Sequence, residues 1–92
     1  MIKGFRCKET EKVFQRRQPK RFRGIQHVAL RKLLVLDAAG SLNDLRVPQG
    51  NRLEKLSGDQ RGQHSIRIND QWRVCFRWRD GHAHDVEIVD YN

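Results

Sequence analysis

The sequence lacks the features that anchor a chain in a membrane or cross-link it. No apolar run is long enough to span a bilayer, and the opening MIKGFRCKETEK has no apolar core of a secretory signal. The two cysteines, Cys7 and Cys75, lie far apart without paired spacing, so they predict neither a disulfide framework nor a zinc motif. We therefore expect a cytoplasmic protein whose cysteines are reduced thiols that fill small gaps.

Apolar residues are also scarce. The chain has 92 residues, of which 37% are hydrophobic. This length is near the lower limit at which one hydrophobic core stabilises a domain without cross-links. We expect a single domain, residues 1–92, with a small and thin core.

Positive charge, in contrast, is abundant. Nineteen Lys and Arg against eleven Asp and Glu give a net charge of +8. Such a surplus favours polyanionic partners, because Lys and Arg neutralise phosphates and release their counterions. Residues 1–23 hold nine basic and two acidic side chains, a net +7, whereas residues 24–92 hold ten and nine, a net +1. Nucleic acid is therefore the expected partner class.

The first half of the chain predicts two helices. Residues 2–6 fit a short strand and residues 8–17 a short helix, which Pro19 ends within a basic run. From Ile25 onward, apolar residues recur at spacings of three and four, as on one helical face, and Gly40 supplies a left-handed stop. The apolar positions are Val28, Ala29, Leu33 and Leu36.

The middle segment predicts short elements only. Ser41 precedes Asp44 by three positions, a capping signature, and Pro48 limits the helix to about two turns. We expect one helical turn and a loop, then a short strand within residues 51–56 and a turn within residues 57–62.

The last third predicts three antiparallel strands. Their expected ranges are 63–68, 72–78 and 83–91. A three-residue loop in the first hairpin sets Ile66 opposite Val74 and Ile68 opposite Trp72, which buries all four side chains together. The same argument predicts a three-residue loop in the second hairpin, with Arg79 opposite Ala83.

This register gives the sheet two unlike faces. One face is apolar and packs on the long helix; it carries Trp72, Val74, Phe76, Trp78, Val86 and Ile88. The other carries Arg67, Arg73, Cys75, Arg77, Glu87, Val89 and Tyr91. Such a face is either solvated, as in many antiparallel sheets, or binds an anion. Arginine favours an anion, because its guanidinium stays charged, binds phosphate through two hydrogen bonds and stacks on bases.

The segment NRLEKLSGDQRGQHSIRINDQWRVCFRW and the ending VEIVDY, with MIKGF and RKLLVLDAA, resemble the HigB-type (host-inhibition-of-growth) toxins of the RelE/ParE superfamily. The resemblance implies an α+β, microbial-ribonuclease-like fold: two N-terminal helices packed on a small twisted antiparallel sheet. It also implies ribosome-dependent cleavage of translated messenger RNA without metal or cofactor. In that reaction the RNA 2′-hydroxyl attacks its own phosphate, and the protein supplies a base, charge stabilisation and an acid.

The resemblance also assigns roles. Arg73 matches the superfamily arginine that holds the scissile phosphate, and Arg67 a position often held by a second cation. Asp90 and Tyr91 match the C-terminal catalytic pair: Tyr91 stacks on a base or assists proton transfer, and Asp90 accepts the proton or orients a neighbour. Further RNA contacts are expected at Arg52, Lys55, Arg77, Arg17, Lys20, Arg21 and Arg23. The last four belong to the basic run, which is either a solvated face or docks on ribosomal RNA.

The sequence departs from this pattern in three places. Glu54 stands where some members have His, Ser57 where they have Lys, and Asn92 where His is common. These departures leave the general acid and base open and make a weak nuclease plausible. Glu54 serves as a base only if burial raises its pKa.

The four histidines of the chain give weaker indications of a functional site than the arginines do. His64 stands at the edge of the site, but strand alternation points it to the packed face. His82 and His84 form a pair that lacks a third metal ligand at suitable spacing, so a turn residue and a strand residue are expected. His27 is expected to be partly exposed on the long helix.

The resemblance implies a helix-turn-helix antitoxin, with operator DNA bound only through the toxin–antitoxin complex, and the ribosome and messenger RNA as targets. Two rival functions stay open. One is a non-catalytic RNA- or ribosome-binding module, and the other a gyrase-targeting toxin of the same superfamily.

Overall fold

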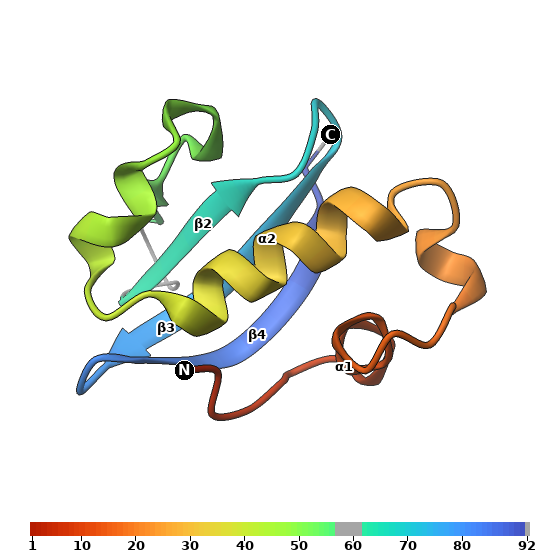
Figure 1. The fold of residues 1–92 in the computed structure, drawn as a ribbon, viewed down its shortest axis with the longest axis horizontal. Coiled ribbons are helices and arrows are strands. Elements are labelled where there is room, and N and C mark those ends of the chain that lie inside the picture. Colours follow the sequence, from red (N-terminus) through yellow and green to blue (C-terminus); the bar gives the residue numbers. More distant parts are fainter. Residues whose placement is uncertain (57–61, 92) are drawn as a thin grey trace.

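The computed structural model describes residues 1–56 and 62–91. They form a four-stranded antiparallel sheet of order β1-β2-β3-β4, with helix α2 lying across one face (Figure 1). The elements are α1 (Lys8–Phe14), α2 (Gln26–Ala38), β1 (Glu54–Lys55), β2 (Gln63–Arg67), β3 (Trp72–Arg79) and β4 (His82–Asp90). Short 3₁₀ helices span Lys20–Phe22, Leu42–Arg46 and Gln49–Asn51. The predicted α+β class, with two N-terminal helices beside a small antiparallel sheet, is confirmed. Of the turn predicted at residues 57–62, residues 57–61 lie outside the described residues.

The N-terminal segment runs beside β4 in parallel, through isolated bridges from Ile2 to Ala83 and from Phe5 to Val86. It forms these two bridges rather than the regular strand expected at residues 2–6. Helix α1 ends at Phe14, earlier than the predicted residue 17, because the chain turns at Arg16 with a positive φ of 62°.

Helix α2 buries the predicted face, since Ala29, Leu33 and Leu36 are fully buried. The left-handed stop predicted at Gly40 is wrong: the chain leaves the helix through an extended Ala39 (φ −67°, ψ 130°). The Asp44 carboxylate accepts hydrogen bonds from the backbone N–H groups of Gly40 (2.9 Å) and Ser41 (3.2 Å). This carboxylate holds the chain after the helix, and the capping box predicted from Ser41 and Asp44 is confirmed.

The first hairpin has the predicted register. Ile66 pairs with Val74 and Arg67 with Arg73. The Ile68 backbone N–H donates to the Trp72 carbonyl at 2.9 Å. The apolar face of the sheet joins one core cluster with the helices, made of Val13, Phe22, Ala29, Leu33, Leu36, Ala39, Leu45, Ile66, Ile68, Val74, Phe76, Ala83, Val86 and Ile88.

The second hairpin differs from the prediction near its turn. Arg79 pairs with His82, not with Ala83, through a two-residue turn in which Asp80 and Gly81 both have positive φ. Asp-Gly favours this tight turn because its twist matches the twist of the strands. A bulge opposite Phe76 absorbs the extra residue, so Val74 still pairs with Ile88 and the apolar face is as predicted.

Both tryptophans pack in the core, as expected. Trp72 meets Phe22 edge-on at 5.5 Å between ring centroids, and Trp78 meets Phe76 edge-on at 6.4 Å. Among the described residues, neither helix has the length and apolar character needed to cross a bilayer.

Candidate functional site

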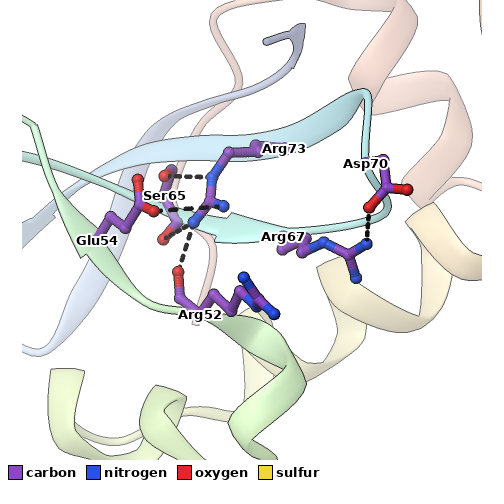
Figure 2. Close-up of polar contacts among 6 residues, drawn as sticks. All are labelled: Arg52, Glu54, Ser65, Arg67, Asp70 and Arg73. Carbon is purple, nitrogen blue, oxygen red and sulfur yellow. Dashed lines mark hydrogen bonds and ion pairs between the residues drawn. The ribbon is translucent and has the colours of Figure 1, made fainter. Parts of the chain in front are cut away.

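Arg73 lies at the start of β3, on the face of the sheet away from Val74 and the core. It is only 7% exposed. Its Nε donates to Ser65 Oγ on β2 at 2.8 Å, and its Nη2 donates to the carbonyl oxygens of Ser65 (3.3 Å) and Arg52 (Figure 2). Three acceptors therefore hold one edge of the guanidinium in a fixed orientation.

The remaining nitrogen, Nη1, makes no hydrogen bond to a described residue. Its only described partner is Glu54 on β1, at 3.8 Å from Nη1 to Oε1, which is longer than a hydrogen bond. The Tyr91 ring lies over the same guanidinium, with 5.4 Å from Cζ to the ring centroid. Nη1 of Arg73 thus has two N–H groups without a hydrogen bond to a described residue, and it lies beside a carboxylate and an aromatic ring. This arrangement suits a phosphate that carries a nucleobase.

Glu54 does not meet the condition set by the sequence for a general base. Its side chain is 52% exposed, so the required burial is missing. Its carboxylate instead lies beside the Arg73 guanidinium, with which it forms an ion pair.

The side chains of the C-terminal pair, Asp90 and Tyr91, lie on opposite faces of the sheet. Tyr91 is 47% exposed and is fixed at the site by its backbone N–H, which donates to the Gln71 carbonyl at 2.7 Å. Strand alternation places Asp90 on the opposite side of β4, where it accepts a hydrogen bond from Gln71 Nε2 at 3.0 Å. The structure therefore brings Tyr91 to Arg73 but turns Asp90 toward Gln71.

Arg67 is the backbone partner of Arg73, as predicted, but its guanidinium points elsewhere. It forms an ion pair with Asp70, in the turn between β2 and β3 (Figure 2). In this structure the Asp70 carboxylate, rather than the Arg73 site, therefore holds the Arg67 guanidinium.

The other predicted RNA contacts fall into two groups. Arg52 and Lys55 are exposed on the segment around β1, near Glu54, and Arg77 lies further along β3, with an ion pair to Asp85 at 3.6 Å from Nε to Oδ2. The second group, Arg17, Lys20, Arg21 and Arg23, lies in the connection between α1 and α2, on the helical side of the sheet (Figure 1). The structure does not bring this second group to Arg73.

Two other ionisable groups near the site favour their neutral forms. Burial raises the pKa of the Cys75 thiol to about 11, with the Glu87 carboxylate adding to the shift and the Arg73 guanidinium opposing it. Burial, and then the Lys55 ammonium, lower the pKa of His64, whereas a hydrogen bond from the imidazole to the Gly62 backbone opposes this shift. The thiol is therefore a packing group rather than a nucleophile.

His64 packs rather than reacts. Its ring stacks on the core residue Phe76 at 6.0 Å between centroids, which agrees with the orientation expected from alternation. His82 and His84 pair with Arg79 and Arg77 across the second hairpin. Within residues 1–56 and 62–91, no three His, Cys, Asp or Glu side chains gather to hold a metal ion.

The sequence reasoning missed the groups that orient Arg73. Ser65 shares its face by strand alternation, a signal that was available in the sequence. The Arg52 carbonyl gave no such signal, because it depends on the fold of the preceding loop. Buried Asn51 holds that loop: its Nδ2 donates to the Leu45 (3.2 Å) and Val47 (3.3 Å) carbonyls, and its Oδ1 accepts from Lys32 Nζ on α2.

Comparisons with known proteins identify the family of the chain. Residues 3–92 match the family described as HigB-like toxin, the RelE-like toxin of type II toxin–antitoxin system HigB. Toxin HigB-1 of Vibrio cholerae serotype O1 is 51% identical over 59 residues, which are 64% of this chain and 62% of that protein. Endoribonuclease HigB of Proteus vulgaris is 31% identical over 61 residues, which are 66% of this chain and 65% of that protein. The chain thus matches less than two thirds of these relatives' lengths.

The fold has solved counterparts. The crystal structure of YafQ from E. coli strain BL21(DE3) matches with a TM-score of 0.63 at 12% identity, covering 99% of this chain and 94% of that chain. At this identity the match supports the fold alone. Since the family model matches nearly the whole sequence, the chain belongs to the HigB-like toxin family.

Proposed function

We propose that this chain is the toxin of a type II toxin–antitoxin pair and acts as a ribosome-dependent endoribonuclease on translated messenger RNA. One observation carries the proposal: a buried arginine whose Nη1 has no hydrogen bond to a described residue and whose guanidinium lies beside an exposed tyrosine, in a protein of net charge +8. Family membership and the endoribonuclease name of the Proteus vulgaris relative support the reaction class.

The proposed reaction needs no group beyond the RNA and the protein. The RNA 2′-hydroxyl loses its proton to a base and attacks the adjacent phosphorus, and the bond to the 5′-oxygen breaks as an acid protonates that oxygen. Nη1 of Arg73 stabilises the charge on the phosphoryl oxygens. The Ser65 and Arg52 oxygens keep the guanidinium oriented, so little reorganisation is needed as the charge develops.

Glu54 and Tyr91 are the proposed partners of Arg73. A phosphate bound at Nη1 lies next to the Glu54 carboxylate, which lacks the burial set as the condition for a general base and is proposed to position the Arg73 guanidinium instead. Tyr91 stacks on a base or assists proton transfer. Asp90 is proposed to orient its neighbour Tyr91 through Gln71. The Asp90 carboxylate accepts a hydrogen bond from the Gln71 side chain, and the Gln71 carbonyl accepts one from the Tyr91 backbone N–H, which holds the end of the chain at the site.

Arg67 is proposed to contact RNA by exchanging its Asp70 partner for a phosphate. Its partner Asp70 is 98% exposed, and exposed ion pairs contribute about 0–1 kcal/mol, so an RNA phosphate can replace the carboxylate. Arg52, Lys55 and Arg77 are proposed to bind neighbouring phosphates of the same strand.

The proposed partners follow from the family. They are a helix-turn-helix antitoxin, the ribosome with its messenger RNA in the cytoplasm, and operator DNA through the antitoxin complex only. The basic connection with Arg17, Lys20, Arg21 and Arg23 is proposed to contact ribosomal RNA.

The test is cleavage of a translated messenger in a translation extract, mapped by primer extension with and without ribosomes. Loss of one donor to a transition-state oxyanion costs about 100- to 1000-fold in rate, so Arg73→Ala is expected to lower cleavage by that amount. Arg73→Lys keeps the positive charge but loses the planar pair of guanidinium donors, so its cleavage rate is expected to lie between those of the wild type and Arg73→Ala. Arg79→Ala, at the exposed far end of β3, is the charge-matched control and is expected to cleave normally.

Equal cleavage by the wild type and by a folded Arg73→Ala protein would defeat the assignment. Stalled translation with an intact messenger would favour the non-catalytic RNA-binding module. Trapped cleaved DNA with an intact messenger would favour a gyrase poison.

A further inference from the structure

A cavity of about 460 Å³ opens between the connection from α1 to α2 and the first turns of α2. Its polar lining comes from Arg16, Gln18, Arg23, Gln26 and His27, and none of the described lining residues is acidic. This cavity is separate from the Arg73 site and has no part in the proposed reaction.

The connection that forms the cavity is anchored at two points. Pro19 and Phe22 are buried, and Phe22 packs edge-on against Trp72. The side chains between and beside these anchors face outward, and Gln26 Nε2 donates to the Arg17 carbonyl at 3.0 Å, which ties the connection to α2. The cavity wall is therefore fixed by packing and hydrogen bonds before any ligand arrives.

Among the described residues, no acidic side chain pairs with the two arginines of the cavity. The Arg23 backbone N–H donates to the Lys20 carbonyl at 3.1 Å, but its guanidinium forms no hydrogen bond or ion pair with a described residue, and among those residues the Arg16 guanidinium contacts only the Phe14 carbonyl, at 3.5 Å. The first turn of α2 adds to this field, because it has no side-chain cap and no acidic residue there. The cavity thus combines two guanidinium groups that pair with no described carboxylate, amide donors and the apolar side chain of Leu30.

We propose that this cavity binds a nucleotide of RNA, with the phosphate between Arg16 and Arg23 and the base against Leu30 and His27. The inference rests on the proposed function for its choice of RNA over other anions. Trp72 directs its side chain to the helical side of the sheet and Arg73 to the other, so one phosphate cannot contact both sites. The cavity therefore binds a phosphate other than the one that is cut.

Binding can be measured on the isolated protein, without ribosomes and without cleavage. Amide chemical shifts are followed by NMR during titration with inorganic phosphate and with a short oligouridylate. Saturable shifts are expected at Gly24, Gln26 and His27, with tighter binding of the oligouridylate. The double variant Arg16→Gln/Arg23→Gln is expected to weaken binding about tenfold or more, because both charge-assisted donors are lost.

Salt dependence gives an independent readout. Loss of one phosphate contact on single-stranded RNA is expected to lower the slope of log affinity against log salt by about 0.7. Arg79→Gln removes a charge outside the cavity and should leave the cavity shifts intact. Arg73→Ala should do the same, which separates this inference from the proposed cleavage: either can fail while the other stands.

The proposal is overturned if the cavity amides show no saturable shift, or if the double variant binds as the wild type does. It is also overturned if inorganic phosphate binds as tightly as the oligouridylate, or if an acidic peptide saturates the same amides more tightly than RNA. The last result would make the cavity a protein-docking site.

Discussion

The hydrogen bond between Arg73 Nε and Ser65 Oγ gives the sharpest test of how the site is built. It is 2.8 Å long, Ser65 is fully buried, and Arg73 is 7% exposed. Hydrogen bonds to charged groups contribute about 1.5–3 kcal/mol, and a buried donor without a partner loses at least that much. Ser65→Ala is therefore expected to lower the free energy of unfolding by about 1.5–3 kcal/mol.

A double-mutant cycle isolates this pair. In an Arg73→Met background the donor is gone, so Ser65→Ala should cost less than about 0.5–1 kcal/mol. Urea unfolding followed by tryptophan fluorescence supplies all four free energies, since Trp72 and Trp78 are both half-buried in the core. Ser41→Ala, which removes a helix cap that shares no partner with Arg73, is the control and should be additive with Arg73→Met.

The same variant has a functional consequence. Without Ser65 Oγ the guanidinium keeps only backbone acceptors, so its orientation toward the RNA is less restricted and cleavage should fall although Arg73 remains. A coupling energy below about 0.5 kcal/mol, or full cleavage by Ser65→Ala, would refute the view that Ser65 orients Arg73.

Two further predictions concern residues around the site. Because the pKa of His64 is lower in the folded protein than its ordinary value, the unfolded chain binds more protons in the window just below about pH 6.5. Stability should therefore fall as pH drops through this window, and His64→Gln should flatten the profile measured by thermal unfolding; an unchanged profile would contradict the assignment. Asn51→Ala leaves buried carbonyls and Lys32 without a partner, so the urea midpoint should fall by an equivalent of about 1–3 kcal/mol; a loss under about 0.5 kcal/mol would show that Asn51 does not hold the loop.

The strand pairing of the first hairpin was predictable because only one register buries all its apolar side chains. Ile66 opposite Val74 follows from that requirement, and a shift of one residue would expose them. The same alternation predicted that Arg73 and Tyr91 share a face, which the cation–π contact confirms.

Local turn chemistry and burial gave conflicting signals in the second hairpin. Burial alone suggested Arg79 opposite Ala83, but Asp80-Gly81 forms the tighter two-residue turn. A bulge at Asp85, where φ is 52°, reconciles the two by adding one residue to β4. No local sequence pattern predicted this bulge, because it satisfies two constraints at different ends of β4: the two-residue turn at one end and the burial of the apolar side chains at the other.

The sequence by itself determined the class of the fold, the two faces of the sheet and the arginine-bearing strand, because these depend on repeats of two and of three to four residues along the chain. Only the tertiary structure decided where each guanidinium points. Arg73 is oriented by the Arg52 carbonyl, 21 positions away in the chain, whereas Arg67 is drawn to Asp70 only three positions away. Alternation sets the face on which a side chain lies, but the direction of a long, flexible cation depends on whichever acceptors the folded chain brings within its reach.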